Sequence, residues 1–193
     1  MQSIRAFVAV NFPPNVKAAL GRVISELRRH PAQAKWVEAG SIHLTLQFLG
    51  NIGYGQVPEI VGALEKCCRE SEPFYVKLSG TGVFPSPVKP RVLWVGVEER
   101  SGRLAALHRC VQYRLAELGF KPEERRFVPH LTLARIKRGT GFEALAEKAA
   151  LLVGGAGELS CSVNSVELMQ SNLTPRGAVY SVLASVPLCR ESR

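Results

Sequence analysis

The sequence predicts an α+β protein of two halves related by a pseudo-two-fold axis. Each half is expected to hold an antiparallel-type sheet with helices outside it, and a groove to separate the halves. Two observations predict this. The tetrapeptide His43–Leu46 recurs as His130–Leu133, and the two histidine positions differ by 87. The same offset carries the apolar run Arg5–Val10 onto Val92–Val97 without a gap, which indicates an internal duplication.

Apolar spacing predicts the elements within each half. Residues between Val16 and Leu27 recur at helical spacing after Pro13 and Pro14, and the stripe from Leu104 to Leu118 repeats it. Helices are expected at residues 16–27, 57–70, 104–118 and 142–152. Strands are expected at 5–10, 43–46, 74–78, 92–97, 130–133, 159–169 and 178–186, with 80–90 as a loop between the halves.

Composition narrows the possible classes. The 193 residues are 46% hydrophobic, enough for a substantial core, and we expect one bilobal domain over 1–193 with halves at about 1–90 and 91–193. All 16 acidic residues are Glu. The absence of Asp excludes a Ser-His-Asp triad, an Asp dyad, an EF-hand loop and an Asp-held Mg²⁺ site in their usual forms.

The net charge of +9 favours polyanionic partners, although arginine-rich solvated helices would give the same count. No apolar stretch is long enough to span a bilayer, and the apolar start is too short for a signal peptide. The five cysteines form no CxxC pair, so we expect reduced thiols in a cytoplasmic protein. They are Cys67, Cys68, Cys110, Cys161 and Cys189.

The repeated tetrapeptide places polar side chains on one face of a strand. Alternation puts His43, Thr45 and Gln47 together, and His130 and Thr132 together, with the leucines on the opposite face. If the halves face each other, two imidazoles and two hydroxyls surround one volume that suits a phosphate. Imidazole exchanges protons near neutral pH, and a Thr hydroxyl donates to phosphate oxygens.

Other interpretations remain open at this point. Histidine and threonine in strands are often structural, although two matched copies favour a function. The two histidines lack a third ligand for zinc, and no phosphate-binding glycine loop is present for a nucleoside triphosphate. Arg135 falls on the leucine face unless the strand bulges or ends there. Trp36, Phe48 and Phe127 could stack a base or belong to the core.

The chain resembles the two-histidine phosphoesterase superfamily, and within it the RNA 2′,3′-cyclic phosphodiesterases of the LigT type, also called 2′-5′ RNA ligases. The resemblance spans essentially the whole chain. The matching segments are Arg5–Val10, Trp36-Val37, His43–Gly50, Phe84–Pro87, Pro90–Val97, Pro129–Arg135, and the late Ser171, Gly177 and Tyr180.

This resemblance implies a bilobal fold and metal-independent, cofactor-free hydrolysis of RNA 2′,3′-cyclic phosphate ends to 2′-phosphate ends. By analogy His130 is the general base and His43 the general acid, while Thr45, Thr132 and Arg135 hold the phosphate. Only the family assigns acid and base, because the halves are nearly symmetric. The expected partner is an RNA end, without ATP or a membrane, and the expected state is a monomer. Two alternatives stay open: a 2′-5′ ligase running the same chemistry backwards, and a non-catalytic module that binds RNA or nucleotide phosphates.

Overall fold

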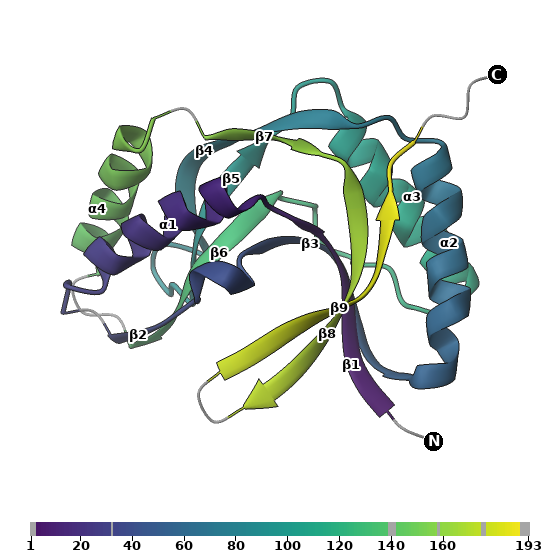
Figure 1. The fold of residues 1–193 in the computed structure, drawn as a ribbon. Helices are drawn as coiled ribbons and strands as arrows, with labels where there is room; N and C mark the ends of the chain where they lie inside the picture. Colours follow the sequence, from purple (N-terminus) through teal and green to yellow (C-terminus); the bar gives the residue numbers. More distant parts are fainter. Residues whose placement is uncertain (1–2, 32, 139–141, 158, 175–176, 190–193) are drawn as a thin grey trace.

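In the computed structural model, which describes residues 3–31, 33–138, 142–157, 159–174 and 177–189, one curled antiparallel sheet carries helices on its outer side (Figure 1). This confirms the α+β class; the two expected sheets join as one. The strands are β1 (Ser3–Asn11), β2 (Gln33–Trp36), β3 (His43–Gly53), β4 (Phe74–Phe84), β5 (Val92–Glu98), β6 (His130–Arg138), β7 (Ser160–Val163), β8 (Ser165–Thr174) and β9 (Gly177–Pro187). The helices are α1 (Pro14–Leu27), α2 (Val57–Arg69), α3 (Arg103–Glu117) and α4 (Phe142–Gly155), with short 3₁₀ turns at Ala39–Ser41 and Tyr54–Gln56.

The strand order repeats itself about a central point. The sheet runs β7-β4-β5-β6-β3-β1-β8-β9, with β2 paired to β6. The 87-residue offset carries β1 onto β5, β3 onto β6 and β4 onto β8, so the six central strands form a palindrome. At its centre Leu44 of β3 lies opposite Leu131 of β6, and these are equivalent positions of the two copies. The arrangement supports the duplication inferred from the sequence.

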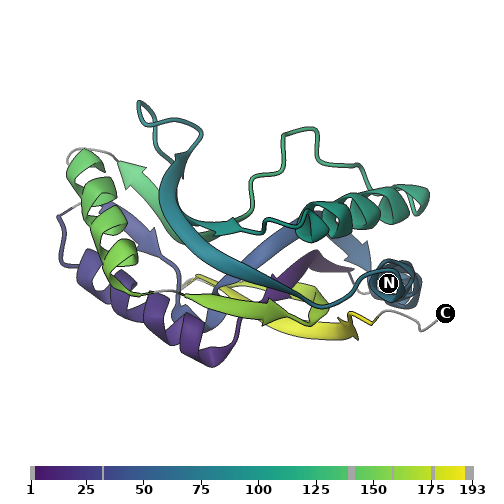
Figure 2. The ribbon, with the colours of Figure 1, turned by 90° about the horizontal axis from the view of Figure 1, so that it is seen from above.

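The two sequence halves interleave in space. Helix α1 packs against α4, and α2 packs against α3, so each helix pair takes one member from each half of the chain (Figures 1 and 2). Helix α4 also contacts β4, while α2 contacts β8 and β9. Neither half can therefore complete its own helical layer without the other.

The apolar stripes seen in the sequence form the core. Leu20 and Leu27 of α1, and Leu107 and Leu115 of α3, are at most 1% exposed. Each such side chain contributes about 1.5–3 kcal/mol through removal from water. One continuous cluster joins residues from all four helices to the outer face of the sheet. A second, smaller cluster of Phe7, Ala9 and Met169 lies on the opposite face, with Tyr180 packed against it.

Several element boundaries differ from the sequence prediction: β3 and β6 continue to Gly53 and Arg138, and β2 was not expected. Strand β4 continues to Phe84 because a bulge at Gly80, whose φ is 67°, lets the strand bend without ending. The connection between the halves is accordingly shorter than 80–90. The single strand expected over 159–169 is two strands that separate at Asn164: β7 pairs with β4, and β8 pairs with β1 and β9.

The expectation of reduced thiols is wrong at two positions. Cys67 of α2 and Cys110 of α3 form a disulfide, while Cys68, Cys161 and Cys189 are free. Sequence spacing gave no indication of the pair, because the two cysteines lie on different helices that only the tertiary fold brings together. The disulfide links the two members of one helix pair.

We expect this disulfide to contribute to stability. It closes a loop with a sequence separation of 43 residues, for which chain-entropy models give about 3–4 kcal/mol. Reduction, or Cys110→Ser, should lower the denaturant concentration at the unfolding midpoint, and reductant should then have no further effect on the variant. Cys161→Ser serves as the control. An unchanged midpoint on reduction of the wild type would contradict the expectation.

Candidate active site

A β-bulge in each central strand decides which side chains reach the groove. Leu46 of β3 and Leu133 of β6 are extra residues relative to the neighbouring strand, and they are equivalent positions of the two copies. An extra residue reverses the alternation of the side chains that follow it. Phe48 and Arg135, two residues beyond each bulge, therefore lie in the groove with the motif residues. The bulge that Arg135 needs in order to reach the groove is therefore present.

The expectation for Gln47 is wrong for the same reason. The bulge turns its side chain away from His43 and Thr45, and it is only 3% exposed. Its Nε2 donates to the carbonyl of Lys121 at 3.4 Å, which joins β3 to the segment leading to β6. Phe48 takes its place on the groove face and is 59% exposed.

The two histidines are held in the same way. His43 Nδ1 lies 2.7 Å from the carbonyl oxygen of Ser41, and His130 Nδ1 lies 2.7 Å from that of Val128. Each acceptor is two residues before its histidine. Because a carbonyl can only accept, Nδ1 carries the proton in both neutral rings. Nε2 is then the nitrogen left to exchange protons with a ligand in the groove.

Aromatic rings fix both imidazoles. The His43 ring lies 4.7 Å from Phe7 and 4.9 Å edge-on from Tyr180. The His130 ring lies 4.9 Å edge-on from Phe84 and 5.9 Å from Trp94, measured between ring centroids. Phe7 and Trp94 are again separated by 87. These contacts limit ring rotation and remove the imidazoles from water.

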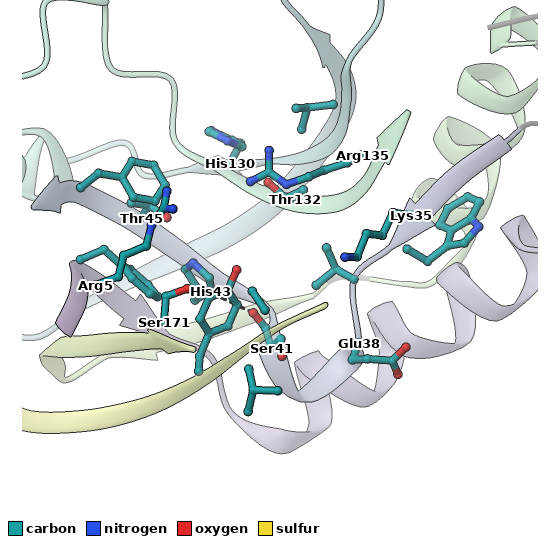
Figure 3. Close-up of a pocket in the computed structure, with 18 of the residues that line it drawn as sticks. Arg5, Lys35, Glu38, Ser41, His43, Thr45, His130, Thr132, Arg135 and Ser171 are labelled. Atoms are coloured by element: carbon teal, nitrogen blue, oxygen red, sulfur yellow. Dashed lines mark hydrogen bonds between the residues drawn. The ribbon is translucent and has the colours of Figure 1, made fainter. Parts of the chain in front are cut away.

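The site lies in a groove of about 820 Å³ in the concave side of the sheet (Figure 3). His43, Thr45, His130, Thr132 and Arg135, the five residues predicted from the sequence, all line it. The lining also includes residues to which the sequence assigned no function: Arg5, Phe7, Lys35, Glu38, Ser41, Phe84, Val92, Ser171, Thr174, Ala178, Val179 and Tyr180. Two of the three aromatic residues that could stack a base, Trp36 and Phe48, also line the groove. The third, Phe127, stacks on the ring of His108 with the ring centroids 3.8 Å apart.

Burial disfavours the charged form of both histidines. It lowers the pKa of His43 to about 4, and the positive charges of Lys17, His130 and Arg135 act in the same direction. The hydrogen bond to the Ser41 carbonyl opposes this shift. Burial also lowers the pKa of His130, against its hydrogen bond to Val128. An anion bound between the rings would raise both values.

A buried polar network lies behind His43. Glu167 of β8 is 5% exposed and accepts a hydrogen bond from the backbone N–H of Asn11 at 3.0 Å. Lys17 Nζ donates to Asn11 Oδ1 at 3.4 Å. The position equivalent to Lys17 in the second copy is Leu104, so the lysine of this network has no counterpart behind His130. The two histidines therefore differ in their surroundings although their anchoring is the same.

Two features are absent from the residues that the structure describes. Those residues hold no cluster of three or more side chains suited to a metal ion. None of the helices in the same part of the chain has both the length and the apolar character needed to cross a membrane.

Comparison with known proteins places the chain. The family model described as "2'-5' RNA ligase superfamily" matches residues 12–174. The chain belongs to this superfamily. A protein of Methanothermobacter thermautotrophicus named RNA 2′,3′-cyclic phosphodiesterase is 36% identical over 92% of this chain and 95% of its own length. One of the same name from Aquifex aeolicus is 35% identical over 95% of this chain and 96% of its own length.

Solved structures share the fold of this chain. A crystal structure of TT0787 from Thermus thermophilus has a TM-score of 0.80 and 30% identity, covering 98% of this chain and all of that one. E. coli LigT complexed with 3′-AMP has a TM-score of 0.75 at 22% identity, covering 97% of this chain and 99% of that one, which shows the shared fold. The resemblance inferred from the paired motifs is thus confirmed.

The pKa shifts predict an acidic pH optimum for kcat/KM. A reaction that needs one protonated and one neutral imidazole slows below the lower and above the higher pKa. Both values are lowered from 6.5 in the free protein, so both limbs of the kcat/KM profile should lie below pH 6.5. The kcat profile should be displaced to higher pH, because the bound phosphate raises both values. Steady-state rates from pH 4 to 9 would test this, and identical profiles for kcat and kcat/KM would contradict it.

Proposed function

We propose that this chain hydrolyses RNA 2′,3′-cyclic phosphate ends to 2′-phosphate ends, without a metal ion, by a pair of histidines acting as acid and base. The observation that carries the proposal is the matched anchoring of His43 and His130. Each ring donates through Nδ1 to a backbone carbonyl, which leaves both Nε2 atoms for one groove. Relatives named RNA 2′,3′-cyclic phosphodiesterase support the substrate class.

The reaction follows from these two nitrogens. His130 Nε2 takes a proton from water as the water oxygen bonds to phosphorus. The bond between phosphorus and O3′ breaks, and protonated His43 gives its Nε2 proton to O3′. General acid and base catalysis of this kind contributes about 10²–10⁴-fold for each group. The near-symmetric geometry suits two opposite proton transfers, and the family analogy assigns His43 as the acid.

The remaining groove residues bind the phosphate and the base. Thr45 and Thr132 donate hydroxyl hydrogen bonds to non-bridging oxygens without adding a charge. The guanidinium of Arg135 offers two parallel donors to the charge that develops on those oxygens. Phe48 presents an exposed ring on which a base can stack, a contact worth about 1–3 kcal/mol.

A binding module without turnover is the second candidate, and the choice of side chains argues against it. Binding alone favours fixed cations, whereas both copies retain a titrating imidazole whose pKa is lowered by burial. The expected partner is thus an RNA end that is turned over. We propose that the protein acts as a monomer in the cytoplasm, with no requirement for ATP.

The proposal is tested with a short RNA that ends in a 2′,3′-cyclic phosphate, incubated with the protein in excess EDTA. Chromatography against 2′-phosphate and 3′-phosphate standards identifies the product. We expect the 2′-phosphate and full activity in the chelator. A 3′-phosphate product, or activity lost in EDTA and restored by Zn²⁺, would overturn the mechanism. RNA binding without turnover would favour the binding module.

A further inference from the structure

The two histidines are anchored alike, but the carbonyls that anchor them belong to different kinds of backbone. Ser41, which accepts from His43 Nδ1, is the last residue of the short 3₁₀ turn Ala39–Ser41 and lies beside His43 (Figure 3). Val128, which accepts from His130, lies in the segment between α3 and β6, outside any helix or strand. A carbonyl orients a ring only as firmly as its own backbone is held. The two histidines therefore depend on different supports.

Half-buried Lys17 of α1 supports the turn before His43. Its Nζ donates to the carbonyl of Gly40, the middle residue of that turn, at 3.0 Å, and to Asn11 Oδ1 at 3.4 Å. Asn11 is the last residue of β1 and pairs with His43 in the sheet register. Lys17 thus joins the two backbone segments that meet at this histidine. In the second copy Leu104 takes its place and offers no side-chain donor.

A buried carboxylate holds Lys17 in place. Glu167 accepts hydrogen bonds from the backbone N–H of Asn11 at 3.0 Å and from the hydroxyls of Ser165 and Ser185. Burying a carboxylate is costly unless hydrogen bonds and a positive charge compensate it. Lys17 shares Asn11 with this carboxylate: burial lowers the pKa of Lys17, and the charge of Glu167 opposes that shift. Glu167 therefore favours the charged ammonium beside His43.

The charged groups that face His43 come from two elements besides its own. Lys17 of α1, and His130 and Arg135 of β6, add to the effect of burial, which lowers the pKa of His43. Tyr180 of β9 presents only its ring to the imidazole. His130 and Arg135 line the groove, where a bound phosphate would compensate their charge, whereas Lys17 lies outside the lining. The Lys17 charge therefore still favours loss of the His43 proton after a phosphate has bound.

We propose that Lys17 is a positioning residue for the proton donor of the reaction, because it braces the turn whose Ser41 carbonyl fixes the His43 ring. The brace keeps the proton of the neutral ring on Nδ1 and directs Nε2 toward the leaving oxygen. It acts on one histidine of a nearly symmetric pair, and so gives a structural reason for the different roles of His43 and His130. The inference rests on the proposed function, which it deepens.

Nitrogen NMR of isotopically labelled protein without RNA tests the inference, because the ring nitrogen shifts report the tautomer and the titration of each imidazole separately. We expect Lys17→Gln to mix the tautomers of His43 and to move its titration midpoint to higher pH, since a repelling charge is lost. His130 should not change, and Lys17→Arg should keep the His43 midpoint near that of the wild type. Lys148→Gln is the matched control, because half-buried Lys148 of α4 also donates to a backbone carbonyl, that of Glu26 at 3.4 Å.

In hydrolysis of RNA with a 2′,3′-cyclic phosphate end, Lys17→Gln should lower kcat about tenfold, as for one lost charge-assisted hydrogen bond. An unchanged tautomer and midpoint of His43 in this variant would overturn the inference, whatever its rate. Equal changes at His43 and His130 would also overturn it, because they would indicate a general loosening of the fold. A wild type that does not hydrolyse the RNA end refutes the proposed function, while the NMR comparison is independent of turnover, which separates the two failures.

Discussion

Replacing either histidine of the pair is expected to lower kcat by about 10²–10⁴, or about 3–5 kcal/mol in the barrier. The expectation follows from the proposed mechanism, in which the Nε2 atom of each histidine in the groove carries one proton transfer. Because each ring is needed for a separate transfer, the two losses should be similar in size. Single-turnover hydrolysis of RNA bearing a 2′,3′-cyclic phosphate measures the chemical step.

At both positions, substitution by asparagine separates a catalytic role from a structural one better than substitution by alanine. In His43→Asn the side-chain amide can still donate to the Ser41 carbonyl, so the anchoring hydrogen bond is preserved while the titrating group is lost. His30→Ala, outside the groove, is the matched control for loss of an imidazole. Full activity in His43→Asn or His130→Asn would show that these rings serve the fold and not the reaction.

The second large effect is expected at Arg135. Its exposed guanidinium lies in the groove with Thr132, where charge grows on the non-bridging oxygens as water attacks. Removal of one such donor typically costs about 10²–10³ in kcat. Arg135→Ala should fall in this range, and Arg135→Lys should recover only part of it because an ammonium lacks the planar fork.

The kinetic constants show whether Arg135 binds the transition state more tightly than the substrate. For Arg135→Ala we expect kcat and kcat/KM to fall together, since the contact strengthens in the transition state. Lys137→Ala, two residues further along β6 and outside the groove lining, is the control. A rise in KM at unchanged kcat would assign Arg135 to substrate binding alone.

Much of this site could be predicted because the duplication repeats its histidine and threonine residues in the sequence. The offset of 87 related the central strands and the apolar helical stripes of the two halves. Period-two alternation placed His43 with Thr45 and His130 with Thr132. These are local properties of the chain. The structure confirms the helices and the central strands at those places, with boundaries that shift by a few residues.

The remainder depends on contacts that sequence periodicity does not encode. The bulges at Leu46 and Leu133 are set by pairing with neighbouring strands, and they exchanged Gln47 for Phe48 on the groove face. Lys35 reaches the site on β2, which pairs with β6 from a distant part of the chain. The family resemblance nonetheless pointed to the bulge, because it implies a phosphate contact for Arg135 that strict alternation after Thr132 would not allow.

The central claim, that the two histidines carry opposite proton transfers, is tested most directly by a substrate with sulfur at the 3′-bridging position of the cyclic phosphate. A thiolate leaves without protonation, so the general acid becomes unnecessary. We predict that this substrate restores His43→Asn to near the wild-type rate and leaves His130→Asn as slow as before. Equal rescue of both variants, or of neither, would contradict the assignment of His43 as acid and His130 as base.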